Sequence, residues 1–68
     1  MIFFIELGKK LAEHRKKNGF SQRQLAKKLK ISQQLLAAYE LGQRRPHAFQ
    51  LFKLSKILSV SVDDLLGL

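Results

Sequence analysis

The sequence predicts a compact all-α domain built from five short helices. Apolar residues recur at intervals of three and four along nearly the whole chain, which is the period of a helix with one buried face. Three serines, Ser21, Ser32 and Ser61, stand directly before such stretches, where a side-chain oxygen can cap a helix. No stretch after residue 6 alternates with the period of two that a half-buried strand requires. We therefore expect one domain over residues 1–68.

The first expected helix carries Leu7, Leu11 and His14 on one face and stops at Asn18-Gly19, a pair typical of helix C-termini. The apolar stretch from residue 1 to residue 5 allows three interpretations. It can extend this helix, form a short strand or arm, or pack on a second subunit. Ordered chain ends often pack on the core of a domain, which favours an extension of the helix.

The second expected helix starts at Ser21 and ends near Lys28, and the third starts at Ser32 after a short turn. The inward face of the third helix is formed by Leu36 and Tyr39. The apolar stripe of the second helix consists of Leu25, Ala26 and Leu29.

Leu41-Gly42 ends the third helix, and residues 43–46 form a loop that the only proline closes. Ser61 caps a short last helix through Leu66, with two aspartates in its first turn, where the helix dipole favours acidic groups. The apolar stripe of the fourth helix, between these two segments, is expected to consist of Phe49 or Phe52 with Leu51, Leu54, Ile57 and Leu58.

The charge of the chain narrows its function. The formal net charge is +8, which indicates a polyanionic partner such as nucleic acid, anionic lipid or an acidic protein. Residues 7–46 carry eleven Lys and Arg against two Glu, a net +9, whereas residues 47–68 are neutral. Cysteine is absent, and neither a metal-ligand motif, a Ser-His-acid set nor a glycine-rich phosphate loop is present. We expect no enzyme, no cofactor, no metal site and no membrane span, in a cytoplasmic protein.

The turn between the second and third helices is the informative feature. About three residues connect the two helices, so they must cross steeply, as in a helix-turn-helix over residues 21–40. The second helix of such a pair can lie in the major groove of DNA, with its first residues at the base edges. Gln33 and Gln34 occupy that place, and glutamine can form two hydrogen bonds with adenine. Contacts with DNA phosphates are expected from Ser21, Arg44, Arg45 and His47, although His47 can alternatively cap the fourth helix.

These residues resemble the Cro/C1-type (Xre-family) helix-turn-helix domain and are similar to the DNA-binding domains of lambdoid phage repressors. The similarity covers residues 7–66. It is carried by SQRQLAKKL at 21–29, ISQQ at 31–34, YE at 39–40, Gly42, Pro46 and LSVSVDDLL at 58–66.

The resemblance implies roles for particular residues. Gln22 matches a glutamine that reaches a DNA phosphate and braces the recognition helix, while Gln33 and Gln34 match the leading base readers. Ala38 matches a later reading position, where a methyl group can contact only a thymine methyl. Specificity by hydrogen bonds should therefore be concentrated at the start of the third helix.

Arg15 and Glu40 match a charge pair that links the first helix to the end of the third. Glu40 is the only acid between Glu13 and Asp63, and an unpaired carboxylate near the DNA would repel phosphate. The chain departs from the family at Lys30, where glycine is usual. Because a non-glycine residue at positive φ costs roughly 1 kcal/mol or more, we expect a slightly rebuilt turn.

The neutral C-terminal third suits a contact between subunits. One five-helix unit reads a single half-site, and half-sites are commonly read by dimers. We therefore predict a sequence-specific transcriptional regulator of the repressor type, a homodimer on a palindromic operator in double-stranded DNA. The alternative is an antitoxin-type module that binds a toxin protein and regulates its own operon. The expected dimer interface consists of Val62, Leu65 and Leu66.

Overall fold

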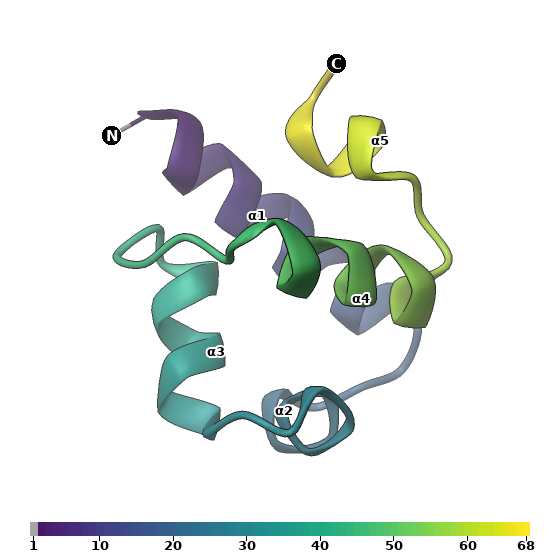
Figure 1. Ribbon diagram of the computed structural model, residues 1–68. Helices are drawn as coiled ribbons and strands as arrows, with labels where there is room; N and C mark the ends of the chain where they lie inside the picture. Colours follow the sequence, from purple (N-terminus) through teal and green to yellow (C-terminus); the bar gives the residue numbers. More distant parts are fainter. Residues whose placement is uncertain (1) are drawn as a thin grey trace.

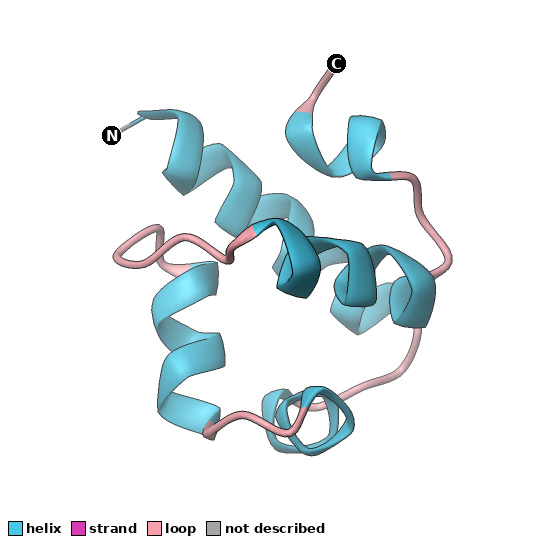
Figure 2. Cartoon of the chain, viewed as in Figure 1, coloured by secondary structure: helices cyan, strands magenta, loops and turns pink. Residues whose placement is uncertain are grey.

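The computed structural model describes residues 2–68, with side chains described from Phe4 onward. Five α-helices follow one another along the chain and are joined by short turns (Figure 1). Within residues 2–68 the chain consists of helices and loops only (Figure 2), which confirms the expected all-α fold. Residues 2–5 extend the first helix; Met1 lies outside the described residues. The helices are α1 (Ile2–Lys17), α2 (Gln22–Leu29), α3 (Gln33–Glu40), α4 (Ala48–Leu58) and α5 (Val62–Leu66).

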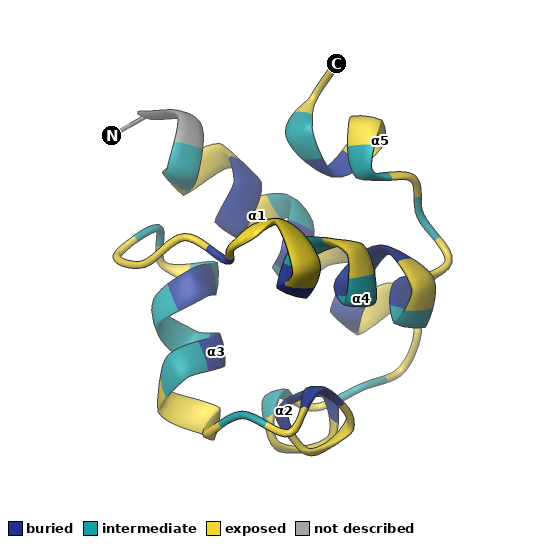
Figure 3. Ribbon diagram, viewed as in Figure 1, coloured by how far each residue is buried: buried dark blue, intermediate teal, exposed yellow. Residues whose placement is uncertain are grey.

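A core of leucines holds the five helices together. α1 packs against α3 and α5, α2 packs against α3 and α4, and α4 also contacts α5. Each of the five helices contributes buried residues to this core (Figure 3). Burying one such side chain stabilises the fold by roughly 1.5–3 kcal/mol relative to leaving it exposed. The largest fully buried side chains are Leu11, Leu25, Leu29, Leu36, Leu54, Leu58 and Leu65.

Serine caps fix where the helices begin. The Ser21 hydroxyl accepts a hydrogen bond from the Gln24 N–H at 3.0 Å, and the Ser21 N–H donates to the Gln24 side-chain oxygen at 2.9 Å. In this reciprocal capping box, the backbone N–H groups of Ser21 and Gln24 each find a side-chain acceptor at the start of α2. Ser32 and Ser61 cap α3 and α5 through the same hydroxyl contact at 3.0 Å. The three helix starts expected from the serines are confirmed.

The expected apolar stripe of α4 is wrong at its beginning. Phe49 is 67% exposed and Phe52 is 51% exposed, whereas Gln50, only 6% exposed, faces the core. Gln50 precedes the buried Leu54 by four residues and therefore shares its face, and the two phenylalanines fall on the opposite side. Their rings lie beneath lysine ammonium groups, Lys53 at 5.8 Å and Lys56 at 5.3 Å from the ring centroids.

The turn between α2 and α3 is also not rebuilt. Lys30 itself adopts the left-handed conformation, with φ 59° and ψ 43°. Its N–H bonds the Lys27 carbonyl at 3.1 Å, and the Ile31 N–H bonds the Ala26 carbonyl at 3.0 Å. The lysine thus makes the helix-ending hydrogen bonds that glycine makes in such a turn, and the backbone strain stays in the fold.

We expect Lys30→Gly to raise the free energy of unfolding by about 1 kcal/mol, because glycine reaches this conformation without steric conflict. Urea denaturation followed by circular dichroism measures the change. The control is Lys28→Gly, at an exposed position inside α2, which should lower stability by about 1 kcal/mol. Equal losses of stability in the two variants would show that residue 30 is not strained.

Candidate nucleic-acid interface

The helix pair α2 and α3 presents its second helix at the surface. In Figure 1, α2 is seen nearly end-on, whereas the axis of α3 lies in the plane of the picture. The two helices therefore cross steeply. The side chains of Gln33 and Gln34 are exposed at the start of α3, while Leu36 and Tyr39 of the same helix are buried. The core therefore fixes one face of α3 and leaves the two glutamines accessible.

Ala38, the third expected reading position, is half-buried. Its carbonyl oxygen accepts hydrogen bonds from the Gln43 N–H at 2.9 Å and from the Arg44 N–H at 3.3 Å. The backbone at Ala38 thus anchors the loop that follows α3, a contribution that the sequence did not indicate.

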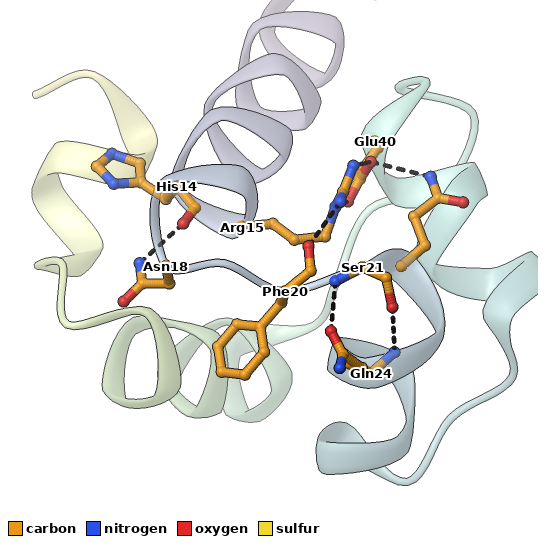
Figure 4. A network of polar contacts seen from close by, with 8 residues as sticks. His14, Arg15, Asn18, Phe20, Ser21, Gln24 and Glu40 are labelled. Carbon is orange, nitrogen blue, oxygen red and sulfur yellow. Dashed lines mark hydrogen bonds and ion pairs between the residues drawn. The ribbon is translucent and has the colours of Figure 1, made fainter.

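Arg15 and Glu40 form a buried ion pair between α1 and the end of α3 (Figure 4). Arg15 Nε lies 2.7 Å from Glu40 Oε2, and Arg15 Nη2 lies 3.2 Å from Oε1, so the contact is two-pronged. The remaining guanidinium nitrogen, Nη1, donates to the carbonyl of Phe20 at 2.9 Å. The side chains are only 10% and 7% exposed, respectively. Such a pair is strongly directional and shielded from salt.

Gln22 completes this network from the start of α2. Its side-chain Nε2 donates to Glu40 Oε1 at 3.0 Å. The structure thereby joins Gln22 to the end of α3, which is the bracing contact that the resemblance implies. Three helices therefore meet at one carboxylate, α1, α2 and α3, and Arg15 also holds the turn after α1 through the Phe20 carbonyl.

The loop after α3 gathers three of the five expected phosphate-binding residues. Arg44, Arg45 and His47 are exposed, and they surround a hollow of about 420 Å³. His47 Nδ1 accepts a hydrogen bond from the Gln50 N–H at 3.1 Å, so this histidine caps α4. The hollow is lined by Tyr39, Arg44, Arg45, Pro46, His47 and Ala48.

The expected dimer residues do not share one environment. Leu65 is fully buried and belongs to the core, so its assignment to a subunit interface is wrong for this folded form. Val62 and Leu66 are half-buried on α5 and remain partly accessible. Leu65 faces inward because α5 is a single short helix whose inner side must cover α1 and α4.

Two contacts that sequence reasoning did not predict, at Gly8 and at Asn18, hold the scaffold of the site. A Cβ atom on Gly8 would lie 2.5 Å from the Tyr39 carbonyl oxygen, so α1 approaches the end of α3 more closely than a side chain allows. Asn18 Nδ2 donates to the carbonyls of His14 at 2.8 Å and Leu58 at 3.1 Å and so connects the ends of α1 and α4. A glycine inside a helical stretch was the only available signal of the first contact.

The chain belongs to the helix-turn-helix family, and its type is Cro/C1. The family model for the helix-turn-helix matches residues 11–65, which include α2, α3 and the seven fully buried leucines of the core. Within residues 2–68, no helix has the length and apolar character needed to cross a membrane. The described residues also contain no group of three or more His, Cys, Asp or Glu side chains placed to hold a metal ion.

Relatives and solved structures agree with this assignment. The chain is 44% identical over 63 residues to the HTH-type transcriptional regulator ImmR of Bacillus subtilis (strain 168), covering 93% of the chain and 50% of ImmR. It is 42% identical over 59 residues to the SPbeta prophage-derived regulator YonR of the same organism, covering 87% of the chain and 55% of YonR. The chain thus spans about half the length of these regulators.

The crystal structure of the restriction-modification controller protein C.AhdI from Aeromonas hydrophila has the same fold. The two structures superimpose with a TM-score of 0.88 at 26% identity, covering 96% of this chain and 98% of the controller protein. The helices of this chain are therefore arranged as in that controller protein.

We expect Arg15→Met to lower the free energy of unfolding by about 3–5 kcal/mol, because it leaves the buried Glu40 carboxylate without its cation. Replacing both partners, Arg15→Met with Glu40→Leu, should restore much of the loss. Thermal and urea denaturation measure both variants. A single variant that loses less than about 1 kcal/mol, or a double variant less stable than the single, would show that the pair is not a buried structural contact.

Proposed function

We propose that this chain is a sequence-specific regulator of transcription that reads double-stranded DNA with α3 in the major groove. The observation that carries the proposal is the pair of exposed glutamines, Gln33 and Gln34, at the start of a helix held from behind by the core and by Glu40. The relatives ImmR and YonR are named as transcriptional regulators, which supports the same role for this chain.

Base reading depends on the two glutamine amides. Each amide offers a donor and an acceptor, which match N7 and N6 of adenine in the major groove. Because Ser32 caps α3 through the Leu35 N–H, the helix start is rigid and the amides begin from a fixed backbone. Ala38 contributes a methyl group for a thymine methyl.

Phosphate contacts flank α3 on both sides. Ser21 and Gln22 stand at the start of α2, which crosses the DNA backbone in a docked helix-turn-helix. Arg44 and Arg45 supply charge from the loop after α3. His47 can cap α4 and bind phosphate together, because a neutral imidazole that accepts at Nδ1 carries its proton on Nε2.

A second copy of the chain is the proposed partner on a palindromic operator. A groove of about 460 Å³ lies between the end of α4 and the start of α5, with the half-exposed Phe52 at its edge. Lys56 lies on one wall, while Asp63 and Asp64 are exposed in the first turn of α5. A two-fold arrangement can set the lysine of one copy against the aspartates of the other. The groove is lined by Phe52, Ser55, Lys56, Ser59, Val60, Ser61 and Val62.

An antitoxin-type module that binds a toxin protein is the second candidate. It is favoured by Leu41, 64% exposed, and Ile5, 42% exposed, which lie on segments that touch at Gly42. Exposed apolar side chains of this size suit a protein partner. Co-expression with the product of the neighbouring gene, followed by size-exclusion chromatography, distinguishes this candidate: a stable complex that Leu41→Lys abolishes supports it, and separate elution of the two proteins contradicts it.

We expect Gln34→Ala to weaken binding to the selected operator by roughly 1–3 kcal/mol and to leave binding to random duplex DNA nearly unchanged. The operator is obtained by selection from a random library, and fluorescence anisotropy measures both affinities. Arg44→Ala is the matched comparison, since loss of a phosphate contact should weaken both duplexes about equally and lower the salt dependence by about one counterion. An equal loss on both duplexes for Gln34→Ala would remove it from base reading.

We expect Phe52→Lys to convert the proposed dimer to a monomer, because it replaces the apolar ring at the groove with a hydrated ammonium group that is costly to bury in the proposed contact. Sedimentation velocity, alone and with operator, measures the assembly. The control is Phe49→Lys, on the same face of α4 and outside the groove, which should remain dimeric. One chain per operator in the unmodified protein would contradict the homodimer, and an unchanged dimer in Phe52→Lys would contradict this interface.

A further inference from the structure

The first turns of α1 pack tightly against the end of α3 and the loop that follows it. The close approach at Gly8 brings α1 against the carbonyls of Tyr39 and Glu40. One turn earlier, a Cβ atom on Gly42 would lie 2.8 Å from the Ile5 Cα, and Gly42 has φ +76°, so this contact also requires glycine. The loop that carries Arg44 and Arg45 therefore begins from a backbone that α1 holds in place.

Phe4 continues this contact to a side chain of the proposed DNA surface. The guanidinium carbon of Arg45 lies 5.5 Å from the centroid of the Phe4 ring, within the range of a cation–π interaction. Phe4 is half-buried on α1, while Arg45 is exposed in the loop. The contact joins residues 41 positions apart in the sequence.

Arg45 is exposed, so its binding groups can reach a ligand. A guanidinium is planar and carries its N–H donors along its edge, so a ring that contacts its face leaves those donors free to bind. Phosphate binds that edge through parallel N–H···O contacts. An arginine that rests on an aromatic ring can therefore hold a phosphate without leaving the ring, and it loses less side-chain freedom on binding.

We propose that Phe4 is a positioning residue for phosphate binding by Arg45. The first turn of α1 then serves DNA binding through Arg45. The inference rests on the proposed function, since it takes Arg45 as a phosphate contact. A purely structural Phe4 would affect stability and would change DNA affinity to the same extent whether or not Arg45 is present.

A double-mutant cycle between Phe4 and Arg45 tests the inference. Phe4→Leu should weaken operator binding about threefold, because Arg45 then loses more side-chain freedom when it binds phosphate. Arg45→Ala should weaken it about fivefold and lower the slope of log K against log salt by about 1. Adding Phe4→Leu to Arg45→Ala should cause no further loss, and Phe4→Tyr, which keeps the ring, should bind like the unmodified chain. Binding is measured at temperatures where circular dichroism shows every variant folded.

Phe49→Leu is the matched control, because Phe49 lies under Lys53 on α4 and its loss should be independent of Arg45. The inference is overturned if Phe4→Leu weakens binding equally in both backgrounds, or if Phe4→Tyr loses as much as Phe4→Leu. If Arg45→Ala leaves affinity and salt slope unchanged, Arg45 is not a phosphate contact and the inference fails with it. Gln34→Ala tests base reading by α3 separately, so the proposed function can stand in that case.

Discussion

The arrangement of the helices depends on the contacts of the buried Glu40 carboxylate. A carboxylate this deeply buried is tolerated only when its oxygens are fully engaged, and three donors from Arg15 and Gln22 engage them. Those donors come from α1 and α2, so satisfying the charge sets the position of α3 relative to both. The large side chains that are fully buried are all leucine, which pack in similar ways in many arrangements. The directional hydrogen bonds at Glu40 therefore select one arrangement of the helices, which a core of leucines alone does not.

Local features of the sequence were sufficient to predict the helices, because their signals lie within a few residues. Each capping serine stands three positions before the residue whose N–H donates to its hydroxyl, and Asn18-Gly19 marks the end of α1. Which side of α4 faces the core could not be predicted in this way. Gln50 or a phenylalanine can each continue an apolar stripe, and packing against α2 and α5 decides between them. The prediction that Leu65 lies at a subunit interface was wrong for the same reason, since only the assembled core shows which leucines of α5 are buried in it.

The candidate site was predicted to a similar extent. Gln33 and Gln34 were expected from the helix-turn-helix pattern and the Arg15–Glu40 pair from the family resemblance, and the structure exposes the glutamines and joins the ion pair. The contacts of α1 with the loop after α3 join residues more than thirty positions apart in sequence, where no periodicity connects them. The left-handed conformation of Lys30 was missed because the steric penalty of one residue is small beside the burial of the neighbouring leucines.

In the proposed function, the exposure of Gln33 and Gln34 separates recognition from stability. Neither side chain joins the core or a helix cap, and the hydroxyl of Ser32, one position earlier, carries the capping role. Substitutions at such surface positions usually change stability by no more than about 0.5 kcal/mol. The same scaffold can therefore acquire a new preferred sequence through one or two point changes. For a lineage of regulators, this makes divergence of targets an easy evolutionary step, and for an engineer it makes these two positions the natural ones to randomise.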